Sequence, residues 1–220
     1  MSMQNTQNIE CPSCHKPVAI EVYQSLSPKR QTHAIQAILD NSFQKGKCSC
    51  GQEVRIEPEF IYMDLENKLC ISAQPSKNLA SYKKFADQAK QSFKMALATT
   101  GMGDGVLMRV TFGWPALREK ILAHTENISD VDVEMMKLAL IRESGEATDP
   151  TTSLRFVELT ESDLIFTRYQ NDAPFDEKES FEYSRSVLEN IIESPQNWAP
   201  LRETMDQGLF VDLNRLFYED

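Results

Sequence analysis

Two cysteine pairs, CysProSerCys at residues 11–14 and CysSerCysGly at residues 48–51, decide how the first part of this chain folds. Thirty-three residues separate the two pairs. Cysteines in tight pairs favour a metal site over disulfide bonds in a reducing compartment. Four thiolates close a tetrahedral shell around Zn²⁺ and leave no position for a substrate. The sequence therefore predicts one structural Zn²⁺, held by Cys11, Cys14, Cys48 and Cys50.

The residues around these cysteines fit a pair of metal-binding knuckles. Pro12 fixes φ between the first two ligands, and Gly51 allows the positive φ that a tight knuckle needs. His15 stands at the equivalent place in the first knuckle, where histidine tolerates a left-handed backbone. A second interpretation makes His15 a ligand in place of one thiolate. The single residue between the second pair of cysteines requires a sharp local turn.

Alternating apolar residues around the pairs predict short strands at 18–23, 53–57, 60–64 and 68–73. A helix is expected to begin near Ser27 and to end at Gly46. The first ten residues are polar and are expected to be frayed. Cys70 lies in the last predicted strand and is expected to be a buried thiol without a role in metal binding. We expect a zinc-ribbon-like domain over residues 10–76, with short antiparallel strands and one inserted helix.

A change of composition at Pro75 predicts a second, α+β domain over residues 77–220. Its expected helices and strands follow from the spacing of apolar residues. We expect helices at 79–97, 115–124, 130–143 and 181–193. We expect strands at 106–113, 154–159 and 164–169, a glycine-rich turn at 101–105, and a tail at 209–218 made of a short strand and a helical turn.

Composition describes a folded, acidic protein. Hydrophobic residues make up 41% of the 220 residues, charged residues 25%, and the net charge is -10, which excludes a disordered or collagen-like chain. Residues 77–125 hold 8 basic and 3 acidic side chains, whereas residues 126–220 hold 8 and 22. Either these two regions attract each other within the fold, or they face different partners. The sequence contains no run long enough to span a membrane and no secretory signal, so we expect a cytoplasmic protein.

The two cysteine motifs resemble those of the CpXC family of bacterial and archaeal proteins, and the segment PheIleTyrMetAsp at 60–64 with Pro75 resembles the family's closing hairpin. The resemblance continues through a second set of positions: Arg109, Leu117, Glu119, Lys120, Ile121, Asp130, Asp132, Glu134 and Lys137. It implies a zinc-ribbon-like domain and supplies no catalytic residues. Two positions depart from the family pattern: one residue instead of two separates Cys48 from Cys50, and His15 replaces a glycine.

No arrangement in the sequence predicts catalysis, so we expect a protein that is not an enzyme. The histidines at 15, 33 and 124 stand in unrelated contexts, and no HExxH motif is present. Asp130, Asp132 and Glu134 have two interpretations. They could form a carboxylate cluster that binds a metal, or they could stand there because acidic residues are favoured at the start of a helix. The loop at 101–105 follows a helix and precedes a strand, which is the wrong order for a phosphate loop.

Three functions remain. A non-catalytic protein-interaction module is the preferred one, because zinc ribbons present rigid sheet edges and the acidic region 126–220 suits a basic partner. A nucleic-acid-binding ribbon is the alternative, in which the lysine-rich helix at 79–97 would use Tyr82, Phe85 and Phe93 to stack on bases. A thiol redox switch that releases zinc on oxidation is the third. The sequence does not identify the partner or the oligomeric state.

Overall fold

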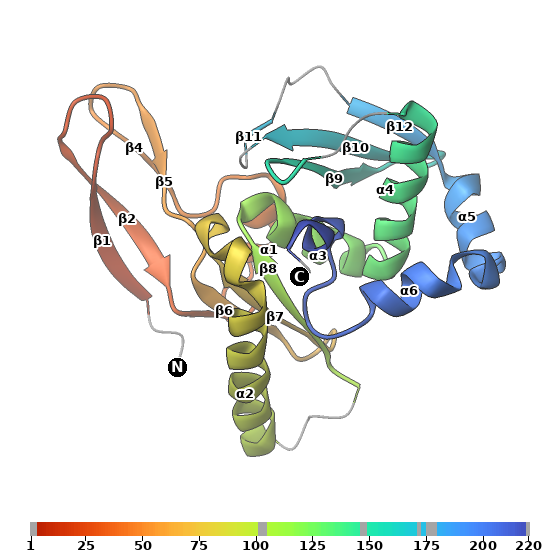
Figure 1. The fold of residues 1–220 in the computed structure, drawn as a ribbon. Coiled ribbons are helices and arrows are strands. Elements are labelled where there is room, and N and C mark those ends of the chain that lie inside the picture. The colour runs from red at the N-terminus through yellow and green to blue at the C-terminus, as the bar shows by residue number, and fades with distance from the viewer. Residues whose placement is uncertain (1–3, 101–104, 146–148, 171–172, 175–179, 219–220) are drawn as a thin grey trace.

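The computed structural model describes residues 4–100, 105–145, 149–170, 173–174 and 180–218. The fold is α+β, as predicted, and combines short helices with several small sheets. Figure 1 shows two hairpins that extend away from a larger body, and the long helix α2, which packs on this body and projects beyond it at its C-terminal end. Among the described residues, no helix is long and apolar enough to cross a membrane.

The extended hairpins form the ribbon. Strand β1 (Gln4–Glu10) pairs antiparallel with β2 (Pro17–Tyr23) along its whole length, and β4 (Lys45–Lys47) pairs with β5 (Glu53–Arg55). The expectation of a frayed start was wrong, because the polar β1 is held by backbone pairing with β2. Of the β1 side chains that the structure describes, Ile9 alone is partly buried. The sequence of such a strand lacks the alternating apolar residues by which a strand is predicted.

The ribbon has a small core of its own. Its members are Cys11, Val18, Ile20, Cys48 and Val54, with Ile9, Cys14 and Ile56 packed against them. Three of these eight residues are cysteines, so the apolar area available to stabilise the ribbon is small. A bound ion that stabilises the folded form would therefore contribute a large share of the ribbon's stability.

The helix inserted between the cysteine pairs is shorter than predicted. Helix α1 spans Ala34–Leu39, and the backbone leaves the helical conformation soon afterwards, since Asn41 and Gln44 have φ of 63° and 53°. Gly46 does not end this helix, contrary to the prediction, but lies within β4. A Cβ at Gly46 would come within 2.8 Å of Val18 Cγ1 and 2.9 Å of Ile20 Cγ1. Glycine at this position lets the two hairpins approach each other.

Replacing Gly46 with alanine is therefore expected to destabilise the ribbon. The added methyl group would displace the side chains of Val18 and Ile20, and overpacking of this kind costs about 1–3 kcal/mol. The loss should appear in urea unfolding and as faster amide exchange in β2 and β4. The variant Lys45→Ala, at an exposed position of the same strand, serves as the control. Equal stability of the two variants would contradict the close approach.

A four-stranded sheet runs through the centre of the body in the order β3-β6-β7-β8. Its strands are β3 (Ser25–Leu26), β6 (Phe60–Asp64), β7 (Leu69–Gln74) and β8 (Leu107–Phe112). The β6–β7 hairpin is as predicted, and β8 lies parallel to β7. The predicted boundary between residues 76 and 77 thus falls between two neighbouring strands of one sheet. Whether each part folds alone stays a prediction.

The crossover between β7 and β8 contains a 3₁₀ turn (Ser76–Ser81) and α2 (Tyr82–Thr100). The predicted helix at 79–97 is confirmed, although it begins and ends three residues later than predicted. Tyr82 and Phe93 are buried and therefore not available to stack on nucleic-acid bases, and Phe85 is partly buried and packs edge-on against Phe112. This corrects the expectation that these rings form a stacking surface. Most of the predicted turn at 101–105 lies outside the described residues.

The acidic part of the chain forms a second, antiparallel sheet, in which β10 pairs with the other three strands. These strands are β9 (Thr152–Leu159), β10 (Asp163–Gln170), β11 (Ala173–Pro174) and β12 (Ser180–Ser184). The hairpin of β9 and β10 is confirmed. The prediction of one helix over 181–193 was wrong in its first turn, because Phe181 and Tyr183 pair with β10. The helix begins only after Ser184, whose side chain caps it.

Helices fill the space beside and between the two sheets (Figure 1). The helices of the body are α3 (Trp114–Thr125), α4 (Asp130–Ser144), α5 (Arg185–Glu193) and α6 (Ala199–Met205), with 3₁₀ turns at Pro195–Trp198 and Leu213–Phe217. Helix α3 contributes Leu117 and Ile121 to the core of the central sheet and Leu122 to the core of the second sheet. The tail has the predicted turn but no strand at its start in the described chain.

Candidate metal centre and buried charge chain

The two cysteine pairs lie at the tips of the two ribbon hairpins, where each chain reverses direction. The first knuckle closes with Cys11 N donating to Lys16 O and His15 N donating to Cys11 O, both at 2.9 Å. The second closes with Cys48 N donating to Gln52 O at 2.8 Å and Gly51 N donating to Cys48 O at 2.9 Å. The second knuckle thus repeats the hydrogen bonding of the first with one residue fewer. This is how a CxC pair makes the required turn.

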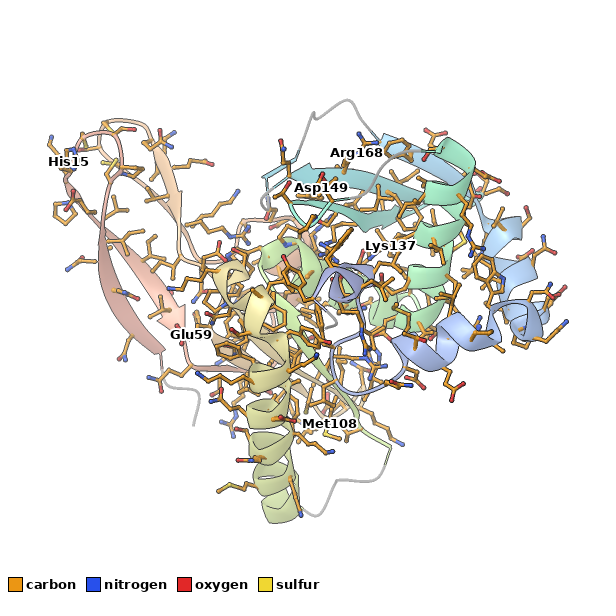
Figure 2. The ribbon with its side chains drawn as sticks, viewed as in Figure 1. His15, Glu59, Met108, Lys137, Asp149 and Arg168 are labelled. Atoms are coloured by element: carbon orange, nitrogen blue, oxygen red, sulfur yellow. The ribbon has the colours of Figure 1, made fainter. Side chains whose placement is uncertain are left out.

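The residue that closes each knuckle has a left-handed backbone, as predicted. His15 has φ of 58° and Gly51 has φ of 93°. The His15 ring does not join the cysteines: it is exposed, and its Nδ1 lies 2.5 Å from Glu10 Oε1. Figure 2 shows His15 at the outer tip of the first hairpin. The four thiols form the group that could hold a metal ion, and His15 is not part of it.

The four sulfur atoms lie at the separations that a tetrahedral metal site requires. All four are within 4.8 Å of one another, with Cys11 Sγ 3.7 Å from Cys50 Sγ and Cys14 Sγ 3.4 Å from Cys48 Sγ. Ligands about 2.3 Å from a central Zn²⁺ lie about 3.8 Å apart at the corners of a tetrahedron. These separations are too long for disulfide bonds, and all five cysteines are free. The predicted ligands therefore fit a metal ion as a set.

The acidity of the thiols also favours a cation at their centre. The backbone N–H of Cys50 donates to Cys48 and lowers the pKa of the Cys48 thiol to about 6. The N–H of Lys16 likewise favours the Cys14 thiolate, but the neighbouring thiols outweigh it and raise the pKa of Cys14 to about 12. Four thiols this close cannot all ionise unless a positive ion offsets their repulsion. Cys70 is buried in β7, separate from this group, as predicted.

The body contains a second unusual feature, a chain of buried charges of alternating sign. Its eight members are Arg109, Asp130, Lys120, Glu134, Lys137, Glu119, Arg155 and Asp212, in the order in which they touch. Successive charged atoms lie 2.6–3.3 Å apart, and every member is at most 8% exposed. Four positive and four negative groups balance each other.

Backbone groups fix the carboxylates of this chain. Glu119 Oε2 accepts from Phe156 N at 2.7 Å, Glu134 Oε2 from Leu213 N at 2.9 Å, and Asp212 Oδ1 from Asn214 N at 2.9 Å. These bonds tie α3 to β9 and tie α4 to the C-terminal segment. The charge chain therefore connects elements that are far apart in the sequence. Removing one buried partner leaves another charge unpaired, which is expensive.

The charge chain explains part of the asymmetry in composition. Arg109 and Lys120, from the basic middle region, pair with Asp130 and Glu134 from the acidic region. The expectation that the two regions attract each other within the fold is thus confirmed for these residues. The carboxylates weighed as a metal cluster are paired instead, since Asp132 contacts Arg202 at 2.5 Å. In the part of the chain that the structure describes, the cysteine group is the one candidate metal site.

Sequence reasoning placed six members of the charge chain among the positions of a family resemblance but did not predict their contacts. A signal was present in α3, where Glu119 and Lys120 interrupt apolar residues on both sides. A helix that is buried all round must pair such charges. Arg155 and Asp212 gave no comparable signal, because Arg155 lies in a strand that is only partly buried and Asp212 lies outside any helix.

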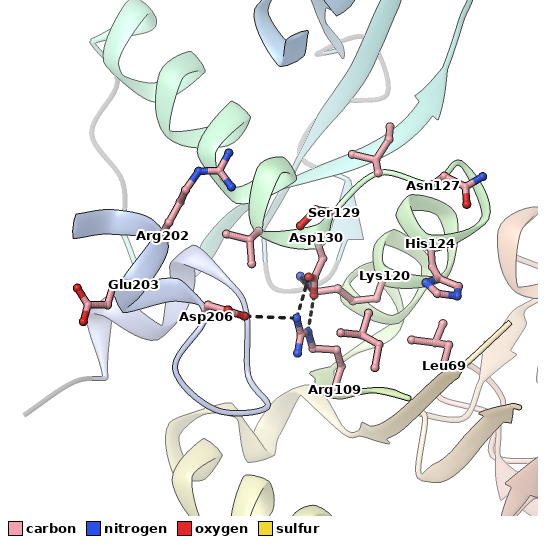
Figure 3. Close-up of a pocket in the computed structure, with 13 residues that line it drawn as sticks. Leu69, Arg109, Lys120, His124, Asn127, Ser129, Asp130, Arg202, Glu203 and Asp206 are labelled. Carbon is pink, nitrogen blue, oxygen red and sulfur yellow. Dashed lines mark hydrogen bonds and ion pairs between the residues drawn. The ribbon is translucent and has the colours of Figure 1, made fainter. Parts of the chain in front are cut away.

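One end of the charge chain opens into a pocket of about 610 Å³ (Figure 3). Arg109 lies on its floor, where Nε and Nη2 donate to Asp130 at 2.7 and 3.0 Å, and Asp206 Oδ1 lies 3.8 Å from Nη2. Burial works against the charged form of Lys120, but Asp130 and Glu134 outweigh it and raise the pKa of Lys120. The charged groups on the floor of the pocket therefore already form ion pairs with one another.

Asp212, at the other end of the charge chain, predicts a loss of stability in acid. Burial alone would raise its pKa, but Arg155, Lys137 and Lys120 outweigh burial and lower the pKa to about 2. A lowered pKa gives stability that is present above the unfolded value of 3.8 and is lost as pH falls toward 2. Stability should therefore fall between about pH 4 and pH 2.

The variant Asp212→Asn tests this dependence, because it removes the titrating group while keeping its shape. It should be less stable than the native protein at pH 7, and the two should converge as the pH is lowered from 4 to 2. Urea unfolding at each pH measures the difference, with Glu161→Gln in the exposed bend before β10 as the control. A difference that stays constant with pH would contradict the lowered pKa.

The fold and the cysteine site together define a zinc-ribbon-like α+β protein whose four thiols can hold a metal ion. The chain belongs to the CpXC family, whose model, described as CpXC protein, matches residues 9–137. This match covers the ribbon from Ile9 onward, the central sheet and six of the eight residues in the charge chain. None of the curated proteins and none of the solved structures matches the chain.

Proposed function

We propose that this protein is a non-catalytic interaction module built on a ribbon that a structural Zn²⁺ holds together. The observation that carries the zinc assignment is the convergence of four thiols from two hairpin tips to within 4.8 Å. A shell of four thiolates selects soft or borderline ions such as zinc, and it leaves no open position for chemistry. The ion's role is then to hold two hairpins that share little apolar core.

The ribbon offers an edge for a partner. Strand β1 pairs with β2 on one side only, and in the described chain no strand pairs with its other side. Native proteins usually protect such an edge with lysine, proline or a bulge, whereas residues 4–9 of β1 carry no charge and no proline. An open edge of this kind accepts an extended partner segment by backbone hydrogen bonds. This supports a protein partner more directly than a nucleic acid.

A pair of matched variants tests the interaction. Thr6→Lys/Asn8→Lys adds two charges to exposed positions of β1, and Gln88→Lys/Gln91→Lys adds two to exposed positions of α2. A protein captured by the full-length, zinc-loaded chain after nuclease treatment would be purified and titrated against each variant by calorimetry. We expect weaker binding for the β1 variant alone. Equal affinities would contradict the assignment of the edge.

Further measurements on the zinc-loaded protein distinguish this function from nucleic-acid binding, a redox switch and catalysis. Retention that disappears with nuclease and with rising salt would favour a nucleic-acid ligand, since phosphate contacts depend strongly on salt. Release of zinc by peroxide together with gained chaperone activity would favour the redox switch. Hydrolytic or transfer activity that survives all surface variants would contradict a non-catalytic role.

A further inference from the structure

A smaller pocket, of about 200 Å³, lies at the opposite end of the charge chain from the pocket at Arg109. It is bounded by α4, β9, β10 and the C-terminal segment, and Lys137 of α4 and Arg168 of β10 are two of its lining residues (Figure 2). Of the described residues that line it, Lys137 alone falls within the family match. The pocket shares no lining residue with the cysteine site or with β1, so neither of those features assigns a role to it.

The wall of this pocket is mostly apolar and reaches the surface. The apolar side chains that line it are Leu138, Ile141, Leu154, Leu213, Leu216 and Phe217. Leu216 and Phe217 are 44% and 38% exposed, and they are two of the four large apolar side chains that the described chain leaves exposed. Single exposed apolar residues are ordinary, whereas exposed apolar residues that gather at a pocket are typical of a ligand-binding site.

Asn214 places an unpaired amide in this apolar pocket. The residue lines the pocket and is 9% exposed. Its backbone N–H donates to Asp212 Oδ1 at 2.9 Å, but its side-chain oxygen and nitrogen have no hydrogen-bond partner in the described chain, and neither atom is closed off from solvent. Polar groups this deeply placed normally have partners, so the Asn214 amide is available to a ligand.

The charged groups that line the pocket are already engaged. Lys137 Nζ donates to two carboxylates of the charge chain at 2.7 and 2.9 Å. Asp212 accepts from a guanidinium at 2.6 Å and from a backbone N–H at 2.9 Å, and the Arg168 guanidinium lies 5.5 Å from the centre of the Phe181 ring. The Asn214 amide is therefore the group that would orient a ligand.

We propose that this pocket binds a small, flat, apolar molecule that carries a neutral carboxamide or lactam group. An apolar cavity of about 150 Å³ accommodates benzene, so this pocket has room for a ring with such a substituent. The Asn214 amide has an acceptor oxygen and an NH₂ donor, and a carboxamide presents the complementary donor and acceptor side by side. A carboxylate only accepts, so it would leave the Asn214 oxygen without a donor. This proposal is independent of the interaction function.

The first test titrates the full-length, zinc-loaded protein with benzamide and with acetophenone, and follows amide resonances by NMR. The two probes have nearly the same shape, but acetophenone carries a methyl group in place of the NH₂ donor. We expect benzamide to shift the Asn214 side-chain amide and the backbone amides of residues 138–141 and 213–217, saturably. We expect acetophenone to bind at least about fivefold more weakly, because it leaves the Asn214 oxygen unpaired. Sodium benzoate should also bind more weakly than benzamide.

Two variants, each with a control, complete the test. Asn214→Leu keeps most of the side-chain volume and should reduce the preference for benzamide over acetophenone to about one, whereas Asn190→Leu, at an exposed position of α5, should leave the preference unchanged. Leu216→Ala, at the exposed mouth of the pocket, should weaken both probes by about threefold or more. Ile192→Ala, which is 52% exposed and lies outside the pocket, should weaken neither.

Several results would overturn the proposal. They are the absence of saturable shifts with benzamide, shifts that map outside the pocket, equal affinities of benzamide and acetophenone, and tighter binding of benzoate than of benzamide. A preference for benzamide that persists in Asn214→Leu, or probe affinities that are unchanged in Leu216→Ala, would overturn it as well.

Discussion

Replacing Cys11 with serine is expected to abolish metal binding and to unfold the ribbon while leaving the body folded. The thiolate shell loses one corner, and structural Zn²⁺ sites in small domains contribute roughly 10–16 kcal/mol of binding free energy at neutral pH. The ribbon core contains only five buried residues, two of which are cysteines, so little else holds β1, β2, β4 and β5 together. The central sheet and its helices keep their own apolar cores.

Hydrogen exchange followed by mass spectrometry locates this effect. Peptides from residues 4–23 and 45–55 should lose protection in Cys11→Ser, whereas peptides from α3 and α4 should keep it. Cys70→Ala is the matched control, because it removes a buried cysteine that lies outside the metal group. The control should retain its metal and the protection of the ribbon. Full metal content and normal ribbon protection in Cys11→Ser would contradict the four-thiol site.

The second large effect is expected from Lys137→Met, in the middle of the charge chain. The Nζ of Lys137 lies 2.7 Å from Glu119 Oε1 and 2.9 Å from Glu134 Oε1, and the residue is 2% exposed. Methionine fills much of the same space without a charge, so the variant leaves a buried carboxylate without its full compensation. Removing one partner of a buried pair costs about 3–5 kcal/mol.

Urea unfolding at pH 7 measures this cost. Lys90→Met, at an exposed position of α2, is the control, and its stability should change by no more than about 0.5 kcal/mol. The urea concentration at the midpoint of unfolding should be far lower for Lys137→Met than for Lys90→Met. A loss below about 1 kcal/mol would show that the charge chain is not tightly coupled, because an isolated exposed pair is worth that much.

The group of four cysteines that could hold a metal ion was predictable because spacing and residue type carry the whole signal. Two cysteine pairs, a glycine after the second and a histidine at the equivalent place in the first are enough to predict two knuckles. The hairpin β6–β7 was predictable for a similar reason, since alternating side chains mark both strands. In each case the structure depends on residues that are close together in the sequence.

The errors occur where distant contacts decide the structure. Strand β1 exists because β2 pairs with it, and its own residues show no apolar alternation. Gly46 looked like a helix end, but its role depends on Val18 and Ile20 in another hairpin. The charge chain joins residues from 109 to 212. The periodicity of one helix does not predict which charges meet between four elements and the C-terminal segment.

The central claim is that Cys11, Cys14, Cys48 and Cys50 hold one zinc ion. Elemental analysis of the full-length protein, purified without chelator and combined with a count of reactive thiols, tests it most directly. The account predicts one zinc per chain and four thiols that react only after a chelator removes the metal. Protein that contains no metal when purified in this way, with all thiols immediately reactive or already oxidised, would contradict it.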